Sequence, residues 1–319
     1  MKKIRLLTAV LALSMLLAGC SQTSLENYVS TTPQGAVVIS ALPDEHAADT
    51  NSATLYFRYA DTSLLKQETR QLSIMPNETR ERALVSALIA GSQEGGAPLF
   101  PPGVEVLSTQ VQSGVVFVTF NEALYGRYED ESGLLTGAEP ALRRRLAMEA
   151  LTATLTESGE HHAVQVLVRA ESDVGASMRL RSSYFLEESE LPAEPLIRSE
   201  DHLMTPANVT HSVLLAWQQR SFDVLYPLLS MQGDAQLLPS QTLFSEAFAR
   251  SDMLIGYTLT PGSISPDGQS AVVCVHMTLR RSEGGEYTVS GWPLRLTREN
   301  GAWKISVSAL RALMQLSEE

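Results

Sequence analysis

The sequence predicts an α+β protein with two folded regions, and three observations lead to this fold class. Residues 53–168 carry strand, strand, helix, hairpin, helix and strand patterns in that order. Residues 205–317 carry helical patterns first and strand patterns afterwards. The charged stretch 187–204 between them contains two prolines, which is typical of a linker. We therefore expect a small mixed sheet with two helices, followed by a domain in which helices precede an antiparallel, cone-like sheet.

In the first region, residues 79–90 have the apolar spacing of a helix. Two strands follow this helix, and Ser113-Gly114 between them predicts a tight hairpin. The pattern predicts a second helix that Pro140 opens, because proline suits the first turn, and that Gly159 ends. The expected strands are 53–59, 67–74, 104–112, 115–121 and 163–168.

In the second region, turn residues separate runs of strand composition. Gly284-Gly285 and Asn300-Gly301 mark the turns between the last three strands. The expected helices are 209–220, 222–229 and 243–249, and the expected strands are 255–259, 271–279, 287–297 and 303–307.

The first twenty residues indicate export. Basic residues near the start are followed by an apolar run over 6–17. This layout is typical of a secretory signal, and the run is too short to span a bilayer, which needs about 20 apolar residues. The tetrapeptide that ends at Cys20, Leu-Ala-Gly-Cys, resembles the bacterial lipobox. The resemblance implies that the Cys20 thiol receives a diacylglycerol and that the chain is cut just before it.

The lipid predicts a location and excludes one class of partner. Two acyl chains anchor a protein stably, so we expect this chain at the outer face of the bacterial cytoplasmic membrane. Cleavage removes Lys2, Lys3 and Arg5, so the net charge of -12 loses three positive charges and becomes -15. Phosphate backbones repel such a chain, and nucleic acid is therefore not an expected partner.

These patterns define five segments. We expect a signal peptide over 1–19, a polar tether over 20–51, a first domain over 52–190, a linker over 191–204 and a cone-like domain over 205–319. The chain has two cysteines, and the lipid uses Cys20. Cys274 is left alone, so no internal disulfide is expected.

Short motifs in a fixed order carry a family resemblance in the first domain. They are Leu55-Tyr56-Phe57, Arg70, Ala87-Leu88-Ile89-Ala90-Gly91, Pro101-Pro102-Gly103-Val104 and the strand 115–121. This pattern resembles the GerM-type (GerMN) domain of sporulation and spore germination lipoproteins. The resemblance implies a role in one of these processes. Such domains are similar to ring-building modules, which implies envelope or spore-assembly partners, or self-association. The loop 91–96 lacks the proline that the family usually places after the helix.

The end of the chain carries a second resemblance. Residues 292–296 (Trp-Pro-Leu-Arg-Leu) and 299–305 (Glu-Asn-Gly-Ala-Trp-Lys-Ile) look like the last hairpin of the nuclear-transport-factor-two-like cone fold. That fold serves enzymes, binders and adaptors alike, so the resemblance implies an architecture and no particular activity.

Few groups are candidates for chemistry. Cys274 and His276 are two apart on one expected strand and face the same way, as a thiolate–imidazole pair requires. No third residue orients them, and a buried cysteine beside a histidine is the simpler interpretation. His161-His162 lie near two glutamates, a zinc-ligand composition, yet adjacent side chains on a turn point apart. This favours a solvated turn.

Two charge runs favour structural interpretations. Residues 143–145, three arginines on the second helix, favour a solvated face over an anion or partner contact. The acidic run 129–131 lies in an expected loop and makes a poor acid pair for glycan hydrolysis. The sequence contains no phosphate loop, dinucleotide fingerprint, nucleophile elbow or zincin motif. We therefore expect no enzymatic activity, no cofactor and no metal, with Cys20 as the one chemical site.

Two functional hypotheses stay open. The first is a non-enzymatic, lipid-anchored envelope component. The second is a small-ligand-binding protein or hydrolase that uses the pocket of the cone-like domain, lined by Tyr257, His276, Tyr287 and Trp292. A deep pocket with convergent polar groups favours the second hypothesis, and a pocket filled by apolar side chains opposes it.

A Cys20→Ala variant tests the anchor. Without the thiol no lipid can be attached, so we expect the protein to be released from the membrane or left unprocessed. Cell fractionation with mass spectrometry of the N-terminus distinguishes these outcomes. A variant that is cleaved correctly and still sediments with membranes contradicts the lipid-anchor interpretation.

Overall fold

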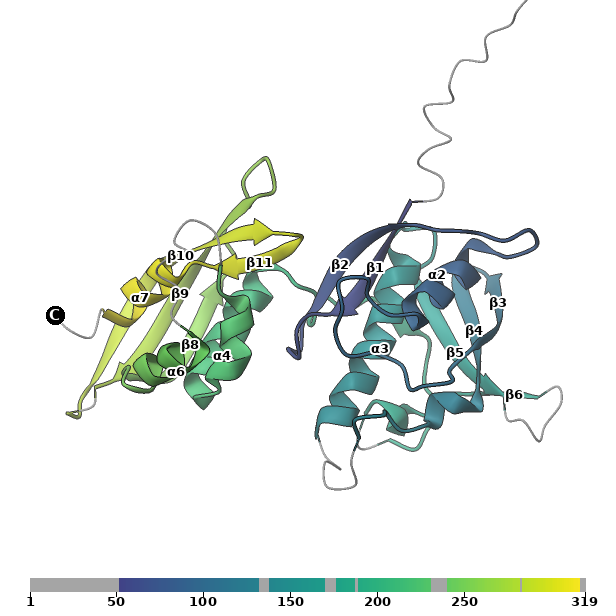
Figure 1. Ribbon diagram of the computed structural model, residues 1–319, viewed down its shortest axis with the longest axis horizontal. Coiled ribbons are helices and arrows are strands. Elements are labelled where there is room, and N and C mark those ends of the chain that lie inside the picture. Colours follow the sequence, from purple (N-terminus) through teal and green to yellow (C-terminus); the bar gives the residue numbers. More distant parts are fainter. Residues whose placement is uncertain are drawn as a thin grey trace, which may run out of the picture. The chain divides into compact units, whose positions relative to one another are not determined.

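The computed structural model describes residues 52–131, 138–169, 176–186, 189–230, 240–281 and 283–315 (Figure 1). The predicted signal peptide, the tether and Cys20 lie outside these residues. Within the described ranges, no helix combines the length and the apolar character that a membrane span requires. Helices and sheets of mixed pairing make up the described chain, which confirms the predicted α+β class.

The first domain begins with an antiparallel hairpin. Strands β1 (Ser52–Arg58) and β2 (Leu65–Gln71) pair so that Ser52 lies opposite Gln71. Leu55, Tyr56 and Phe57 of β1 are all buried, although neighbouring strand residues face opposite sides. Both faces of β1 are therefore covered, and the helices α2 and α3 contact this strand.

The second sheet of this domain has the strand order β3-β4-β5-β6. Its strands are β3 (Val106–Gln112), β4 (Val115–Asn121), β5 (Ala163–Arg169) and β6 (Ser177–Arg179). Ser113 and Gly114 join β3 to β4 with φ of 52° and 74°, the left-handed pair that a tight hairpin needs. The two central strands, β4 and β5, run parallel, with Val115 opposite Ala163.

Two helices complete the domain, as expected. Helix α2 (Arg80–Ile89) starts where the Thr79 hydroxyl accepts a hydrogen bond from the Arg82 amide at 3.2 Å. Helix α3 (Ala138–Thr156) starts two residues before Pro140, and Gly159 follows its end with a φ of 75°. Short 3-10 turns, η2 (Glu122–Tyr125) and η3 (Ser182–Tyr184), follow β4 and β6.

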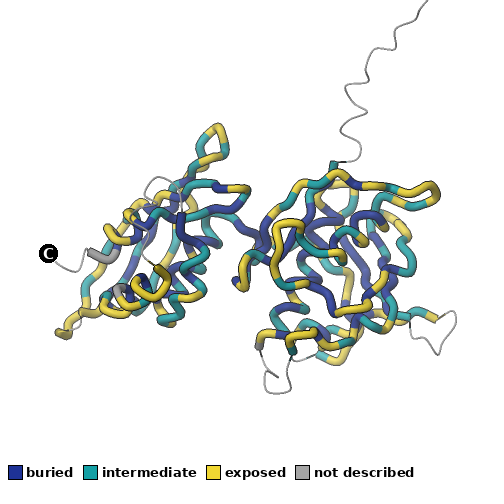
Figure 2. Tube along the Cα trace, in the orientation of Figure 1, coloured by how far each residue is buried: buried dark blue, intermediate teal, exposed yellow. Residues whose placement is uncertain are grey.

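Helix α3 is covered by neighbouring elements on several sides (Figure 1). It contacts β1 and β5, and also α2. Between Leu146 and Leu155 every residue except Glu149 is buried (Figure 2). The hydroxyls of two threonines in this stretch bond to backbone groups: Thr152 Oγ1 donates to the Met148 carbonyl at 2.7 Å, and Thr154 Oγ1 accepts from the Tyr56 amide of β1 at 3.3 Å. Packing on several sides explains why the helix carries more than one apolar stripe.

The segment expected to be a linker, 191–204, is instead built into both sheets of the first domain. Strand β7 (Leu196–Ile197) pairs with β5, and the Ala193 amide donates to the Leu180 carbonyl at 2.7 Å. Farther on, the Leu65 amide donates to the His202 carbonyl at 2.7 Å. Backbone hydrogen bonds of this kind form whatever the polarity of the side chains. The charged, proline-containing composition of this segment therefore predicted a linker, although its backbone pairs with strands.

The second domain places helices before an antiparallel sheet, as predicted. The helices are α4 (Pro206–Gln219), α5 (Phe222–Leu225) with the 3-10 turn η4 (Tyr226–Leu228), and α6 (Gln241–Ala249). The sheet order is β11-β10-β9-β8, formed by β8 (Met253–Thr260), β9 (Ser270–Arg280), β10 (Glu286–Glu299) and β11 (Ala302–Ile305). A closing helix, α7 (Val307–Gln315), was not expected from the sequence.

One face of this curled sheet is buried and the other is not. On β9 the residues Ala271, Val273, Val275, Met277 and Leu279 are at most 2% exposed, and the residues between them are partly exposed. The buried set packs with Trp217 of α4 and other apolar residues into one core. Apolar side chains therefore fill the concave side of the cone-like domain.

Of the arginine run 143–145, Arg145 is exposed as the sequence favoured, but Arg143 is buried. Arg143 is only 5% exposed, and its guanidinium donates to both carboxylate oxygens of Asp130 at 2.8 Å. It also lies 4.5 Å from the centre of the Tyr128 ring. The acidic loop and the basic helix turn are thus partners, because the fold brings the two opposite charge runs together.

Replacement of Arg143 tests this contact. We expect Arg143→Ala to lower the free energy of unfolding by about 1–3 kcal/mol, because it removes charged hydrogen bonds and a cation–π contact from a site whose Asp130 end is exposed. Arg145→Ala, in the same helix with a half-exposed pair, is the matched control and should cost about 0.5 kcal/mol or less. Urea unfolding measures both.

The same pair predicts a pH dependence. The hydrogen bond from Arg143 holds the pKa of the Asp130 carboxyl below its ordinary value. The contribution of the Arg143–Asp130 pair to the free energy of unfolding is therefore fully present above the unfolded-state pKa of Asp130, about 3.9. It is lost as the pH falls through the lower pKa that Asp130 has in the folded state. The stability difference between the native protein and Arg143→Ala should shrink below about pH 4. A difference that stays constant to pH 2 contradicts the pairing.

Candidate functional site

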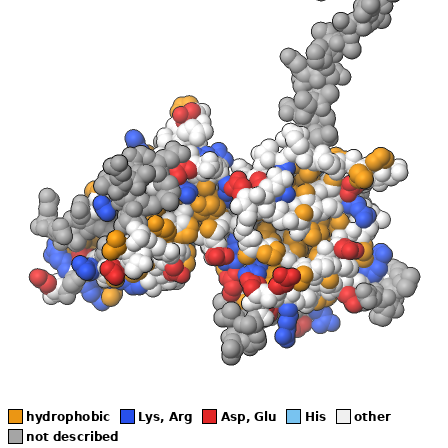
Figure 3. Space-filling view, viewed as in Figure 1, with side chains coloured by type: hydrophobic (Ala, Val, Ile, Leu, Met, Phe, Trp, Pro, Cys, Tyr) orange, Lys and Arg blue, Asp and Glu red, His pale blue; other side chains and the backbone are white. Residues whose placement is uncertain are grey.

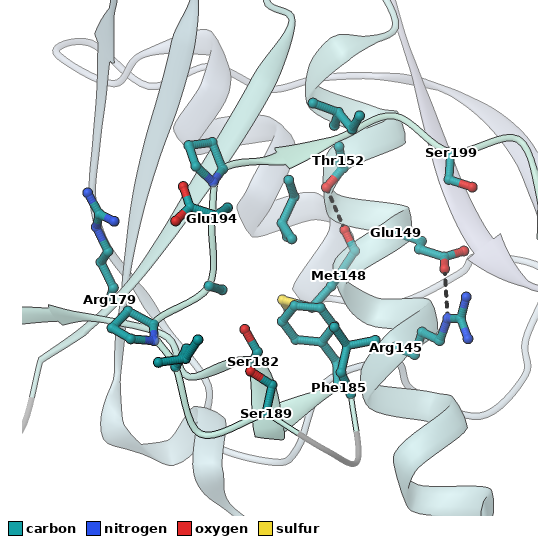
Figure 4. A pocket seen from close by; sticks show the side chains of 17 residues that line it. Arg145, Met148, Glu149, Thr152, Arg179, Ser182, Phe185, Ser189, Glu194 and Ser199 are labelled. Atoms are coloured by element: carbon teal, nitrogen blue, oxygen red, sulfur yellow. Dashed lines mark hydrogen bonds and ion pairs between the residues drawn. The ribbon is translucent and has the colours of Figure 1, made fainter.

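A cavity of about 680 Å³ forms a groove along α3 (Figure 4). Arg145, Met148, Glu149 and Thr152 form one wall, and their spacing of three, four and seven residues places them on one face of the helix. The other wall comes from residues 179–199. Its apolar members are Phe185, Leu186, Leu191, Pro192, Ala193, Pro195, Leu196 and Ile197. We call this cavity the α3 groove.

The α3 groove exposes apolar side chains. Leu191 is 71% exposed, Ile197 is 73% exposed and Leu186 is 44% exposed. Large apolar side chains that gather in a concave surface mark a binding site more often than a chance arrangement. The space-filling view shows further hydrophobic patches, interspersed with charged side chains, on the part of the surface over the first domain (Figure 3).

The charged groups of the groove lie at opposite sides. Arg145 and Glu149 stand on the α3 side, and Arg179 and Glu194 stand across the cavity (Figure 4). Glu149 accepts a hydrogen bond from Arg145 Nε at 3.1 Å and lies 2.6 Å from Nδ1 of His202. Thr152 donates to the helix backbone. The charged groups on the α3 side are therefore engaged with one another, and the described lining shows no nucleophile beside a base that a third group orients.

Cys274 and His276 do not meet in a conical pocket. Both lie on the partly exposed face of β9, opposite the filled interior. Nδ1 of His276 accepts a hydrogen bond from the Gly291 amide at 3.2 Å, where β10 bulges between Val289 and Trp292. The imidazole therefore has a structural task, since it satisfies a backbone amide that the bulge removes from the ladder.

The other residues proposed to line a cone pocket also do not converge. The Tyr257 hydroxyl lies 3.1 Å from Nδ1 of His211 on α4. The Tyr287 hydroxyl donates to Asp252 at 2.9 Å, and burial together with this carboxylate raises the pKa of Tyr287 to about 12. Trp292 packs against the edge of the apolar core. The filled interior opposes the hypothesis of a ligand pocket in the second domain.

The two adjacent histidines have different neighbours. Nε2 of His161 lies 3.1 Å from Glu81 of α2. The His162 ring lies over Gly114, where an added Cβ would come within 2.7 Å of its Nδ1 atom. Among the described residues, no group of three His, Cys, Asp or Glu side chains is placed to hold a metal ion.

Sequence reasoning missed the α3 groove itself. Most of its outer wall lies in residues that read as the end of a domain and a linker. A signal was nevertheless present, because Leu191, Leu196 and Ile197 flank the two prolines of this segment. Branched aliphatic residues are uncommon in a solvated linker, so their presence indicates a packed or binding surface.

A family model matches most of the first domain. The family model Germane, described as "Sporulation and spore germination", matches residues 54–172. This match confirms the GerM-like resemblance read from the motifs of the first domain. No curated protein matches the chain.

Solved structures give distant likenesses. Tandem GerMN domains of the sporulation protein GerM from Bacillus subtilis align over 80% of this chain and 61% of theirs, with 12% identity and a TM-score of 0.31. A putative lipoprotein from Clostridium perfringens aligns over 47% of this chain and 88% of its own, with 20% identity and a TM-score of 0.27. A SEC-C motif containing protein from Rhodopseudomonas palustris aligns over 32% and 76%, with 16% identity and a TM-score of 0.28.

The α3 groove can be tested with an apolar dye. We expect Nile red to bind the full chain, and Leu191→Asp with Ile197→Asp to weaken that binding at least tenfold, because charges replace the exposed apolar rim. Both side chains are mostly exposed, so the unfolding free energy should change by about 0.5 kcal/mol or less per site. Leu243→Asp, at an exposed position of α6, is the matched control. Equal dye binding by all three proteins contradicts an apolar groove at this place.

Proposed function

We propose that this chain is a lipid-anchored, extracytoplasmic protein that acts in sporulation or spore germination as a non-enzymatic component of the cell envelope. The observation that carries the proposal is the Germane match over residues 54–172. The lipobox-like tetrapeptide at Cys20 supports the anchor and the location at the outer face of the cytoplasmic membrane.

Binding, and not catalysis, is the activity that the geometry of the first domain supports best. The α3 groove is lined mainly by apolar side chains, and Glu149 on its helical wall is paired with Arg145 and His202. Apolar concave surfaces bind apolar groups of partners, whereas catalysis needs convergent, unpaired acid, base or nucleophile groups. The partners in this proposal are other envelope or spore-assembly proteins, including a second copy of the chain.

The second domain fits an adaptor with the nuclear-transport-factor-two-like cone architecture. Helices precede a curled antiparallel sheet whose concave side is filled. A filled cone leaves the outer surface for contacts and favours the binding role over the alternative, a small-ligand-binding protein or hydrolase that uses this domain.

Gene replacement in the bacterium that encodes this chain tests the proposal. We expect deletion to lower the yield of heat-resistant spores or their rate of germination by at least tenfold. A full-length copy should restore the phenotype, and so should a Cys274→Ala, His276→Ala double variant, because these side chains carry no chemistry in this account. Normal sporulation and germination of the deletion strain contradicts the proposed role. Failure of a folded double variant supports the enzymatic alternative.

A further inference from the structure

A second cavity, of about 420 Å³, lies where η2, α3 and the segment after β5 come together. Its lining consists of Tyr125, Arg144, Met178, Arg181, Ser183 and Tyr184. None of these residues lines the α3 groove. We call this cavity the tyrosine–arginine pocket.

The apolar part of the pocket is unusually exposed. Tyr125 is 50% exposed and Met178 is 70% exposed. The Tyr125 ring stands edge-on to Tyr184, with the ring centres 6.0 Å apart and an interplanar angle of 79°. Tyrosine, methionine and arginine are the side chains enriched where proteins bind one another, and they are all present here.

The polar groups of the pocket favour an anion. Arg144 and Arg181 contribute guanidinium groups, and no carboxylate or amide side chain is part of the lining. Burial raises the pKa of both Tyr184 and Tyr125 above the ordinary value, so both phenols keep their protons and can donate. A sugar would need acceptors for its hydroxyl protons, which such a lining supplies poorly.

Two buried atoms point to a missing acceptor. Tyr184 is only 7% exposed, and its hydroxyl has no hydrogen-bond partner within the described parts of the chain. The same holds there for Nε of Arg144, whose guanidinium lies 5.6 Å from the centre of the Tyr184 ring. Buried polar atoms are rarely left unpaired, so an acceptor is missing here, and a ligand oxygen reaches these donors when the lining side chains shift.

The ion pairs already present are weak enough to exchange. Arg181 lies 3.3 Å from Glu190, but the two side chains are 67% and 78% exposed. Arg144 approaches Glu131 only to 3.9 Å. The exposed Arg181–Glu190 pair contributes little to stability, so an incoming carboxylate can replace Glu190 at small cost. The Arg144–Glu131 pair is more buried but long, which leaves the Arg144 guanidinium open to a closer acceptor.

We propose that the tyrosine–arginine pocket binds a carboxylate side chain next to an aromatic or aliphatic one, presented by an acidic segment of a partner protein. The carboxylate meets the two arginines, and the apolar neighbour packs on Tyr125 and Met178. This inference rests on the proposed function, in which the first domain is a protein-binding module. The inference adds the chemistry of the partner segment. The two guanidinium groups repel a strongly basic segment, so such a partner is not expected to bind here.

Selection from a phage-displayed library of random dodecapeptides on the full chain tests this pocket. We expect the enriched peptides to combine Asp or Glu with Phe, Trp or Leu. Arg144→Gln with Arg181→Gln should weaken their binding at least tenfold in fluorescence anisotropy. Arg280→Gln is the matched control, because this half-exposed arginine of β9 also pairs with a glutamate, Glu286, at 2.7 Å. The control variant should bind the enriched peptides as tightly as the native chain does.

Several results overturn the inference. They are the absence of enrichment, enrichment of basic peptides, equal binding by the double variant, and displacement of the peptide by inorganic phosphate or acetate at equal concentration. Enriched peptides that match an acidic segment of this chain overturn the choice of a different protein as partner. If Arg144→Gln does not fold, Arg181→Gln alone gives the same test at an exposed position. A normal phenotype of the double variant beside a defective deletion strain rejects this pocket and leaves the proposed function standing.

Discussion

The burial of α3 between β1 and the β3–β6 sheet is the constraint on which the first domain depends. Because neighbours cover the helix on several sides, its threonine hydroxyls bond to the backbone, and one of them satisfies the outward amide of Tyr56. A helix turns about 100° per residue, so three consecutive arginines must face three neighbours. Arg143 meets the acidic loop, Arg144 reaches the tyrosine–arginine pocket and Arg145 borders the α3 groove.

This arrangement links the core to function. The same helix that fills the domain interior forms a wall of both cavities, so the groups that line them from this side stand on a rigid element. The segment after β5 supplies the opposite walls through short strands and the turn η3. The first domain therefore presents two concave surfaces on one buried helix.

Local signals predicted much of the fold, and long-range contacts account for what they missed. Ser113-Gly114 and Thr79 mark a hairpin and a helix start through conformations that only their own neighbours determine. Strands β6 and β7 are too short to leave a period in the sequence and exist through pairing with β5. The burial of Arg143 depends on Asp130, which comes from a separate loop. Alternation placed Cys274 and His276 on one face, but only the helices decide which face of the sheet is filled.

Amide hydrogen exchange followed by mass spectrometry tests the central role of α3 most directly. If the helix is held between the hairpin and the sheet, the amides of residues 146–155 can exchange only when the whole domain opens, and they should be as slow as those of β5. The Tyr56 amide should share this protection, because Thr154 accepts its hydrogen bond. Exchange of α3 at a much lower opening free energy than β5 would contradict the account, since the helix would then be a surface element and not the centre of the domain.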